Sequence, residues 1–246
     1  MESGTNLKLQ SEHPRVRHGH QSPEAYALLL IHQKAYEFAA TLPHKRILDW
    51  GCNNGYGMKL LQDRGHSVAG LDVSSSLLDE ARKLGLSELY LLETDTMQFS
   101  SQPFDMITSF QVIEHVVDYD AYIGEVKRHL QPEGVAVFTT PNAAIRLDEG
   151  QKPWSEFHVR EFRGGELRDL LGRYFRSVTV SGLFACPKIT QLEMNRSSRA
   201  RRGLTSASSR RALIFPRRLP NCTTECLYYS DSDLDSALDL MAICKI

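Results

Sequence analysis

One stretch, residues 46–57, limits what the chain can fold into more than any other part of it. An apolar run that ends at an acidic residue predicts a buried strand, and a helical pattern at residues 58–64 follows a turn rich in glycine. Such a turn lets the backbone approach a ligand and presents unpaired helix N–H groups to it. Gly51, Gly55 and Gly57 are therefore expected at a ligand, and an ordinary strand-to-helix connection is the alternative.

A second predicted strand, residues 66–72, also ends in a carboxylate. Asp72 follows the glycines by about twenty residues, the separation at which the acidic residue of a nucleotide-binding unit accepts hydrogen bonds from a ribose diol. A charge at the start of the next helix is the alternative role for Asp72. The glycines are spaced G-x-x-x-G-x-G. This spacing disfavours NAD, whose binding turn reads G-x-G-x-x-G.

Residues 47–84, with the runs ILDWGCNNGYG and GLDVSSSLLDEARKL, resemble the class I S-adenosylmethionine-dependent methyltransferases. The resemblance implies a Rossmann-like, doubly wound α/β sheet of seven strands, mostly parallel with an antiparallel last strand. It also implies S-adenosylmethionine as the cofactor. Asn53 stands where the family usually has a glycine, and because Asn tolerates left-handed backbone conformations, the turn is expected to keep its shape. The cofactor contacts implied here are Asp49, Gly51, Cys52, Asn53, Gly55, Asp72 and Val73.

Further expectations follow from two later runs. Asp95, after a predicted strand at 88–92, matches the acidic residue that accepts the adenine amino group in the resembling family, with Thr96 beside it; a turn-forming Asp is the alternative. The run FQVIEHV, after a predicted strand at 104–110, is the most family-specific stretch.

In an open parallel sheet, ligands bind beyond the carboxyl ends of the strands, where the strand order reverses. The first and fourth strands flank that point in the expected sheet. Phe110 and Gln111 are therefore expected at the methionine end of the cofactor, and Glu114 and His115 close to the transferred methyl group.

Methyl transfer to an alcohol hydroxyl needs a base, because such a hydroxyl does not ionise by itself at neutral pH. His158 is the first candidate and His115 the second, since neutral imidazole accepts protons at pH 7. Glu114 is expected to orient a histidine or to bind the acceptor, and purely local structural roles are the alternative for both histidines. Together with Asp148, the three residues could instead hold a divalent metal. The spacing of these residues in the sequence is not typical of a known metal-binding motif, so no metal is assigned.

The run FHVREF, the helix after it and the terminal residues 231–243 resemble bacterial sugar and glycan O-methyltransferases. This implies a sugar or glycan-like hydroxyl as the acceptor. A quinone, another natural product, a lipid or RNA is the first alternative, and a non-catalytic cofactor-binding module is the second. The terminal run is expected to supply the seventh strand, antiparallel and beside the sixth.

One domain is expected at residues 23–246, after a flexible N-terminal segment at residues 1–22. A helix is predicted at 23–42, with His32 and Tyr36 one turn apart and surface packing preferred for both over a role in closing the site. The stretch at about 195–218 has eight arginines and no acidic residue. It is expected to be a solvated insertion or lid, with anion binding as the second interpretation and nucleic acid as the least favoured.

Net charge and cysteine content limit the partners and the cell compartment that are expected. Net charge is −1, so no overall field attracts nucleic acid or a membrane surface. The five cysteines are odd in number and scattered, which favours a reduced, cytoplasmic setting. Zinc is not expected at Cys222 and Cys226, because no second Cys or His pair lies nearby in the sequence. Neither a signal peptide nor a membrane span is expected, and the oligomeric state is not predicted.

Overall fold

The computed structural model describes residues 22–92, 99, 101–201 and 222–246, with side chains up to residue 198 in the last helix before the second long gap. Expectations for the N-terminal segment, for Asp95 and Thr96, and for most of the arginine-rich stretch therefore lie outside the described residues. Within them, no helix combines the length and the apolarity needed to span a bilayer.

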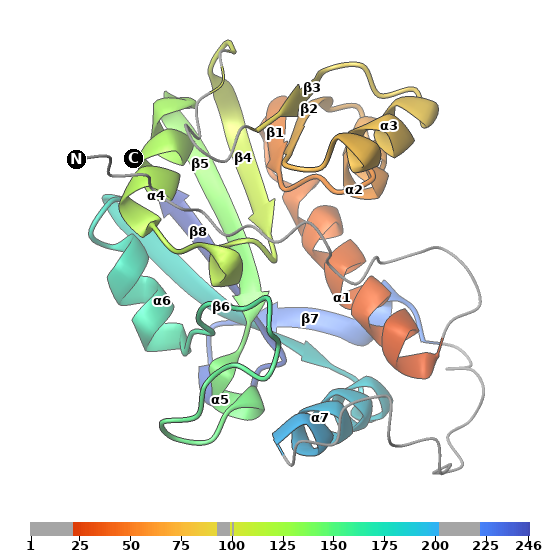
Figure 1. The fold of residues 1–246 in the computed structure, drawn as a ribbon, viewed down its shortest axis with the longest axis vertical. Coiled ribbons are helices and arrows are strands. Elements are labelled where there is room, and N and C mark those ends of the chain that lie inside the picture. Colours follow the sequence, from red (N-terminus) through yellow and green to blue (C-terminus); the bar gives the residue numbers. More distant parts are fainter. Residues whose placement is uncertain (1–21, 93–98, 100, 202–221) are drawn as a thin grey trace.

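An eight-stranded sheet with the order β3-β2-β1-β4-β5-β8-β6-β7 forms the centre of the molecule (Figure 1). Strands β1 to β5 pair in parallel, β8 pairs antiparallel with both β5 and β6, and β7 pairs antiparallel with β6. The expected Rossmann-like class is therefore confirmed. The strands are β1 (Arg46–Trp50), β2 (Ser67–Asp72), β3 (Leu89–Leu91), β4 (Phe104–Phe110), β5 (Leu130–Pro141), β6 (Ser177–Ala185), β7 (Leu227–Ser230) and β8 (Asp239–Lys245).

The strand count differs from the expected seven, because β7 adds an eighth strand at the edge of the sheet. Four residues of β7 pair with the end of β6 and cover an edge that would otherwise expose unpaired backbone groups. The terminal run does supply the antiparallel strand next to β6, but that strand begins only at Asp239. Before it the chain turns through Asp233, whose φ is 52°, and a short 3-10 helix.

Helices cover both faces of the sheet. On one face α4 and α6 pack over the largest buried apolar cluster, and on the other α1 and α2 pack over a second one, with α3 beside α2 (Figure 1). Caps explain two helix starts: Ser22 accepts the amide of Ala25 in α1, and Asp118 accepts that of Ala121 in α4. The helices are α1 (Pro23–Ala39), α2 (Tyr56–Gln62), α3 (Ser75–Lys83), α4 (Tyr119–Arg128), α5 (Ala143–Arg146), α6 (Gly164–Leu171) and α7 (Pro187–Arg201), with 3-10 turns η1 (Ile113–His115), η2 (Thr224–Cys226) and η3 (Leu234–Ser236).

Two helices lie in segments for which the sequence predicted no helix. The one-turn α5 forms because Asn142 accepts the amide of Ala144 while its own amide group donates to two carbonyls of the 234–237 turn. The longer α7 begins with a proline at its first position, buries Ile189 and Leu192, and continues to Arg201. The described beginning of the arginine-rich stretch is therefore helical.

Candidate functional site

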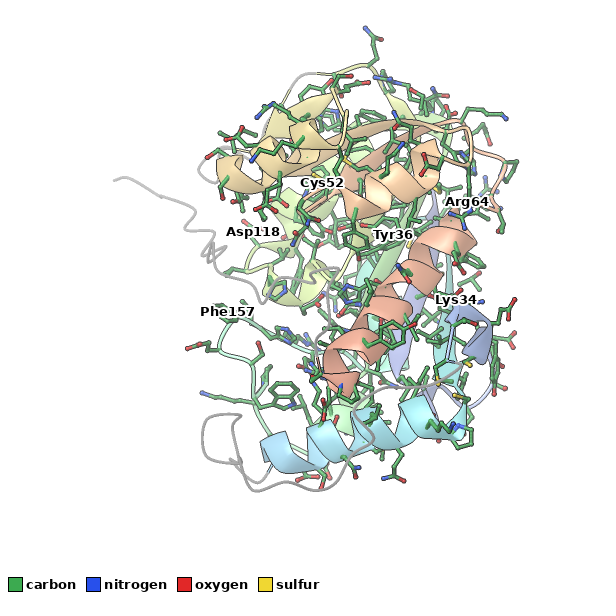
Figure 2. The ribbon with its side chains drawn as sticks, turned by 90° about the vertical axis from the view of Figure 1, so that its right-hand side faces the viewer. Lys34, Tyr36, Cys52, Arg64, Asp118 and Phe157 are labelled. Carbon is green, nitrogen blue, oxygen red and sulfur yellow. The ribbon has the colours of Figure 1, made fainter. Side chains whose placement is uncertain are left out.

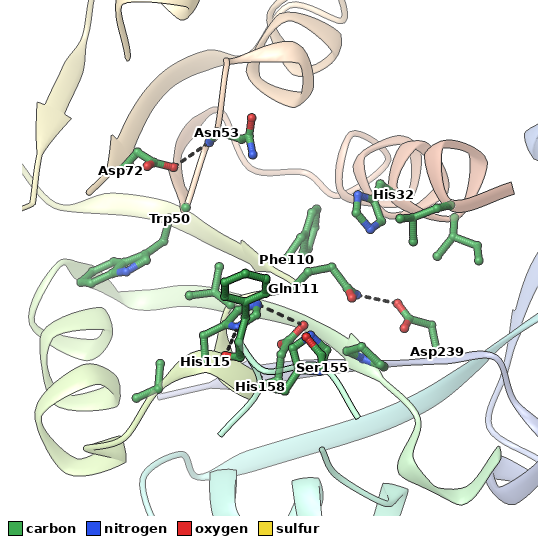
Figure 3. Close-up of a pocket in the computed structure, with 18 of the residues that line it drawn as sticks. His32, Trp50, Asn53, Asp72, Phe110, Gln111, His115, Ser155, His158 and Asp239 are labelled. Carbon is green, nitrogen blue, oxygen red and sulfur yellow. Dashed lines mark hydrogen bonds and ion pairs between the residues drawn. The ribbon is translucent and has the colours of Figure 1, made fainter. Parts of the chain in front are cut away.

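A single cavity brings together most of the residues that the sequence selects (Figure 3). It lies at the carboxyl ends of β1, β2, β4 and β5. The antiparallel β8 adds Asp239 there, because an antiparallel strand begins where its neighbour ends. The expected residues on the cavity wall are Gly51, Asn53, Asp72, Val73, Phe110, Gln111, Glu114, His115 and His158. Asp49, Cys52 and Gly55 are not on the wall.

The glycine-rich turn follows the edge of this cavity in left-handed conformations. Gly51 and Gly55 both have a φ of 81°, and Asn53 has a φ of 53°, so Asn53 holds the left-handed position as expected. A Cβ added to Gly51 would lie 2.6 Å from Cγ2 of Val112. The turn therefore needs glycine at Gly51 both for its conformation and for the close approach of the η1 segment.

Asp72 is held at the cavity wall by the backbone of two loops. Its Oδ2 accepts the amide of Asn53 at 2.8 Å (Figure 3). Its Oδ1 accepts the amide of Ser74 at 2.9 Å. Ser74 is the N-cap of α3. Asp72 therefore does act at the start of a helix, the alternative role predicted for it. The same carboxylate also faces the cavity.

Asp49 lies behind the wall and holds α1 in place. The hydroxyl of Tyr36 donates to Asp49 Oδ2 at 3.0 Å, and the hydroxyl of Thr108 donates to Oδ1 at 2.9 Å. Burial raises the pKa of Asp49 to about 7. Tyr36 is 4% exposed and lines the cavity, so the preferred surface role is wrong for it (Figure 2). His32, one turn earlier, also lines the cavity.

The remaining loop residues have packing roles. A Cβ on Gly57 would lie 2.0 Å from the ring of Tyr36, so Gly57 makes room for this side chain. Cys52 is fully buried in a cluster with Met58, and Gly55 is the N-cap of α2. These three positions shape the turn from behind.

His158 is positioned by a buried ion pair. Its Nδ1 lies 2.7 Å from Oε1 of Glu161, and Arg146 donates to the same carboxylate from Nε at 2.8 Å and from Nη2 at 3.0 Å. Although burial would raise the pKa of Glu161, hydrogen bonds from His158 and Arg146 hold it below its usual value. An ionised carboxylate only accepts hydrogen bonds, so Nδ1 carries the proton and Nε2 is the basic nitrogen of His158.

Glu114 and His115, in η1, face the same histidine. Burial raises the pKa of Glu114 to about 7, and burial lowers that of His115 to about 4. His115 donates from Nδ1 to the carbonyl of Phe157 at 2.7 Å, and its ring centroid lies 4.8 Å from that of His158. One ligating atom from each of these three residues lies within 4.8 Å of the others, whereas Asp148 is exposed and stands outside the described group.

The sequence missed several residues of the cavity wall. Asp239 is one of them: its Oδ2 accepts a hydrogen bond from Gln111 at 2.8 Å, and burial raises its pKa well above its usual range (Figure 3). Gln111 itself was expected here, but its left-handed conformation, with a φ of 58°, was not. No sequence signal marks a left-handed Gln. The others come from segments for which the sequence predicted no helix or strand, and recognition of α7 as a helix could have revealed Glu193 and Arg196. They are Arg146, Trp154, Ser155, Glu193 and Arg196.

The buried Glu114 predicts a measurable pH dependence of stability. Its folded pKa of about 7 exceeds the usual value of a free Glu, so the folded chain binds this proton more tightly. The resulting stabilisation is present at low pH and is lost as pH rises through the folded pKa. We expect the free energy of unfolding of Glu114→Gln, relative to wild type, to rise by up to about 3 kcal/mol between pH 5 and pH 8. Urea unfolding of both proteins at both pH values measures this difference, and a constant difference contradicts the assignment.

Comparison with known proteins agrees with the fold. Residues 19–175 match the family model described as a methyltransferase domain. A probable S-adenosylmethionine-dependent methyltransferase of Mycobacterium tuberculosis is 26% identical over 228 residues, which cover 86% of this chain and 81% of the relative. A ubiquinone biosynthesis O-methyltransferase of Pasteurella multocida is 33% identical over 120 residues, which cover 43% of this chain and 50% of that protein.

A solved structure shares the fold at low sequence identity. The S-adenosylmethionine-dependent methyltransferase of Thermotoga maritima described as a possible histamine N-methyltransferase superposes with a TM-score of 0.57 at 16% identity, covering 90% of this chain and 94% of that one. The family match spans more than half of the sequence and includes the glycine-rich turn, Asp72 and the η1 segment. The chain therefore belongs to the methyltransferase-domain family, as an S-adenosylmethionine-dependent methyltransferase.

Proposed function

We propose that this enzyme methylates a hydroxyl group of a sugar or glycan-like acceptor, with His158 as the general base. The supporting observation is the chain of contacts from Arg146 through Glu161 to Nδ1 of His158. Because Nδ1 of His158 is bound to Glu161, Nε2 of His158, on the cavity wall, is the nitrogen that can accept a proton. An imidazole fixed in one tautomer by a buried carboxylate is an arrangement suited to taking a proton from a weakly acidic hydroxyl.

The walls of the cavity fit the cofactor. The carboxylate of Asp72 is an acceptor suited to the two ribose hydroxyls, and Gly51 lies on the same wall. Asn53 and Val73 adjoin it, and the apolar side chains of Trp50, Leu77 and Leu92 line the same end of the cavity. When bound, S-adenosylmethionine supplies a methyl group already activated by its sulfonium. We assign these residues to the cofactor, with Phe110 and Gln111 between the cofactor and the acceptor.

The protein groups therefore have to orient the acceptor and take its proton. His158 accepts the proton at Nε2, and Glu161 stabilises the resulting imidazolium because it is ionised and in contact with Nδ1. Arg146 keeps Glu161 ionised through two hydrogen bonds. His115, with a pKa of about 4, is a weak base, and we assign it a hydrogen-bonding role at the acceptor instead.

Several polar side chains line the part of the cavity assigned to the acceptor. Nε1 of Trp154 is buried without a hydrogen-bond partner among the described residues, so it is a donor that an acceptor oxygen would satisfy. Arg196 pairs with Glu193 at 3.1 Å and lies 5.4 Å from the centroid of the Trp154 ring. A wall of closely spaced donors and acceptors suits a molecule with several hydroxyls better than an apolar one.

A phenolic acceptor of the quinone type is the second candidate. It is favoured by the similarity to the ubiquinone biosynthesis O-methyltransferase, which covers half of that protein. A phenol has a pKa near 10, like the tyrosine side chain, and is far easier to ionise than a sugar hydroxyl. Methylation of a phenol should therefore depend less on a protein base.

The two candidates differ in a direct assay. We expect transfer of labelled methyl from S-adenosylmethionine to sugars or glycosides, with loss of transfer in His158→Ala at all pH values up to about 9, because a sugar hydroxyl stays un-ionised there. Transfer to catechol-type phenols alone, with His158→Ala recovering activity as pH rises, would instead establish the second candidate. Turnover that requires added Mg²⁺ would favour a metal at Glu114, His115 and His158 over the base.

A further inference from the structure

Three cysteines that are far apart in the sequence meet at one end of the sheet. Cys186 lies between β6 and α7, Cys226 ends η2 just before β7, and Cys222 is four residues earlier. Their sulfur atoms all lie within 4.8 Å of one another. The amide of Cys186 donates to the carbonyl of Cys226 at 2.9 Å, which fixes the two chain segments side by side. The sequence showed only the Cys222 and Cys226 pair, because the third ligand comes from 36 residues before it.

This spacing is close to that of a metal–thiolate site. A tetrahedral zinc ion with Zn–S bonds of about 2.3 Å separates its sulfurs by about 3.8 Å. The three sulfurs therefore need only small shifts to share one ion. Cys222 is 5% exposed, and Cys186 and Cys226 are partly buried, so one side of the cluster is open to an additional ligand.

The sulfur of Cys186 faces several hydrogen-bond donors. Burial acts against ionisation, but hydrogen bonds from the backbone amides of Ile189 and Lys188 and from the other two cysteines lower the pKa of this thiol. The amides belong to the first turn of α7, where unpaired N–H groups stabilise negative charge. Burial, followed by the charge of Cys186, raises the pKa of Cys222 to about 11. Metal binding would release the thiol protons of the cysteines that bind the ion.

We propose that Cys186, Cys222 and Cys226 bind one Zn²⁺ ion through their sulfurs, with a water molecule at the fourth position. Each thiol that binds the ion gives its proton to the buffer. The site does not depend on the identity of the methyl acceptor. Zinc is the ion that a three-thiolate set with an open position suits best among the common divalent cations, because Mg²⁺ and Ca²⁺ prefer oxygen ligands.

The ion would connect the start of α7 to the segment that enters β7. This matters for the active site because Glu193 and Arg196 lie on α7 and line the acceptor side of the cavity. The hydroxyl of Tyr26, on α1, donates to the carbonyl of Cys222 at 3.1 Å, so α1 joins the same junction. We therefore expect zinc to stabilise the folded chain and to lower the KM for the acceptor more than the Kd for the cofactor.

The site is tested first on the wild-type chain. Protein purified under reducing conditions with chelator, then freed of the chelator, is titrated with Zn²⁺ against a chromophoric competitor. We expect one ion per chain, bound more tightly than about 100 nM, and a higher melting temperature with zinc than without it. Replacing Zn²⁺ by Co²⁺ should give the near-ultraviolet thiolate-to-metal absorption of a sulfur site. Absence of tight binding by the reduced wild type overturns the proposal without any variant.

Variants then locate the ligands. Cys186→Ser and Cys226→Ser should each weaken zinc binding by at least about 100-fold and remove the thermal shift, since even outer partners of a ligand change affinity 10- to 100-fold. Cys244→Ala is the matched control, because this cysteine is buried in β8 away from the cluster, and it should bind zinc like the wild type. Unchanged binding in both serine variants would place the metal elsewhere and contradict the assignment. A disulfide joining two of the three cysteines in protein isolated without reductant, together with no zinc binding after reduction, would identify a redox pair instead.

Discussion

We expect His158→Ala to lower kcat by about 10²- to 10⁴-fold while changing the Kd for S-adenosylmethionine by no more than about threefold. The reason is the division of roles along the cavity. His158 is held by Glu161 at 2.7 Å on the acceptor side, whereas the residues assigned to the cofactor belong to the turns after β1 and β2. Steady-state kinetics with the best acceptor and calorimetric titration with the cofactor measure the two quantities separately.

A control variant and chemical rescue distinguish a base from a structural residue. His115→Ala removes a neighbouring imidazole whose pKa is about 4, so we expect a much smaller loss of kcat than for His158→Ala. Added imidazole should restore part of the turnover of His158→Ala, because the cavity left by the side chain faces the acceptor. A comparable loss of cofactor affinity in His158→Ala, or no rescue together with a lowered melting temperature, would contradict the base assignment.

Glu161 extends this argument to a residue that positions the base. Glu161→Gln keeps the size of the side chain but removes the charge that contacts both Arg146 and Nδ1 of His158. The buried guanidinium of Arg146 then lacks its partner, so we expect lower stability as well as lower kcat. Because Glu161→Gln changes stability and kcat together, its loss of activity cannot be assigned to the base alone. His158→Ala is therefore the decisive variant.

The sequence was sufficient for the parts of the fold that repeat a local pattern. The strand, glycine turn and helix around Gly51 were predicted because backbone conformation there is restricted by residue type, and Asn53 takes the left-handed position that this requires. The cavity could be placed at the carboxyl ends of the strands because parallel topology fixes which loops meet. Most of the selected residues on those loops do line it.

What the sequence could not give depends on contacts between distant segments. Tyr36 looked like a surface residue of an amphipathic helix, but its hydroxyl reaches the buried Asp49 and its ring occupies the space left by Gly57. The edge strand β7 is too short to stand out as a pattern, and it forms because β6 offers it an edge. Cys186 joins Cys222 and Cys226 only through the pairing of β6 with β7.

The cofactor site is best tested with two aspartates that the sequence treated alike. Asp72 lines the cavity, whereas Asp49 lies behind it and accepts hydrogen bonds from Tyr36 and Thr108. We expect Asp72→Ala to weaken binding of both S-adenosylmethionine and S-adenosylhomocysteine by about 100-fold or more. A hydrogen bond to a charged group contributes about 1.5–3 kcal/mol, and two ribose hydroxyls are available to it.

Asp49→Asn is the matched control for this measurement. The pKa of Asp49 is about 7, so near neutral pH the carboxyl is partly protonated, and an amide of the same size imitates that form. We expect its Kd values to stay within about fivefold of the wild type in calorimetric titrations. Normal cofactor binding by Asp72→Ala would leave its carboxylate only the role of holding Asn53 and Ser74. Equal losses of cofactor affinity in both variants would mean that the buried contact between Asp49 and Tyr36 is as important for cofactor binding as Asp72, because it holds the glycine-rich turn in place.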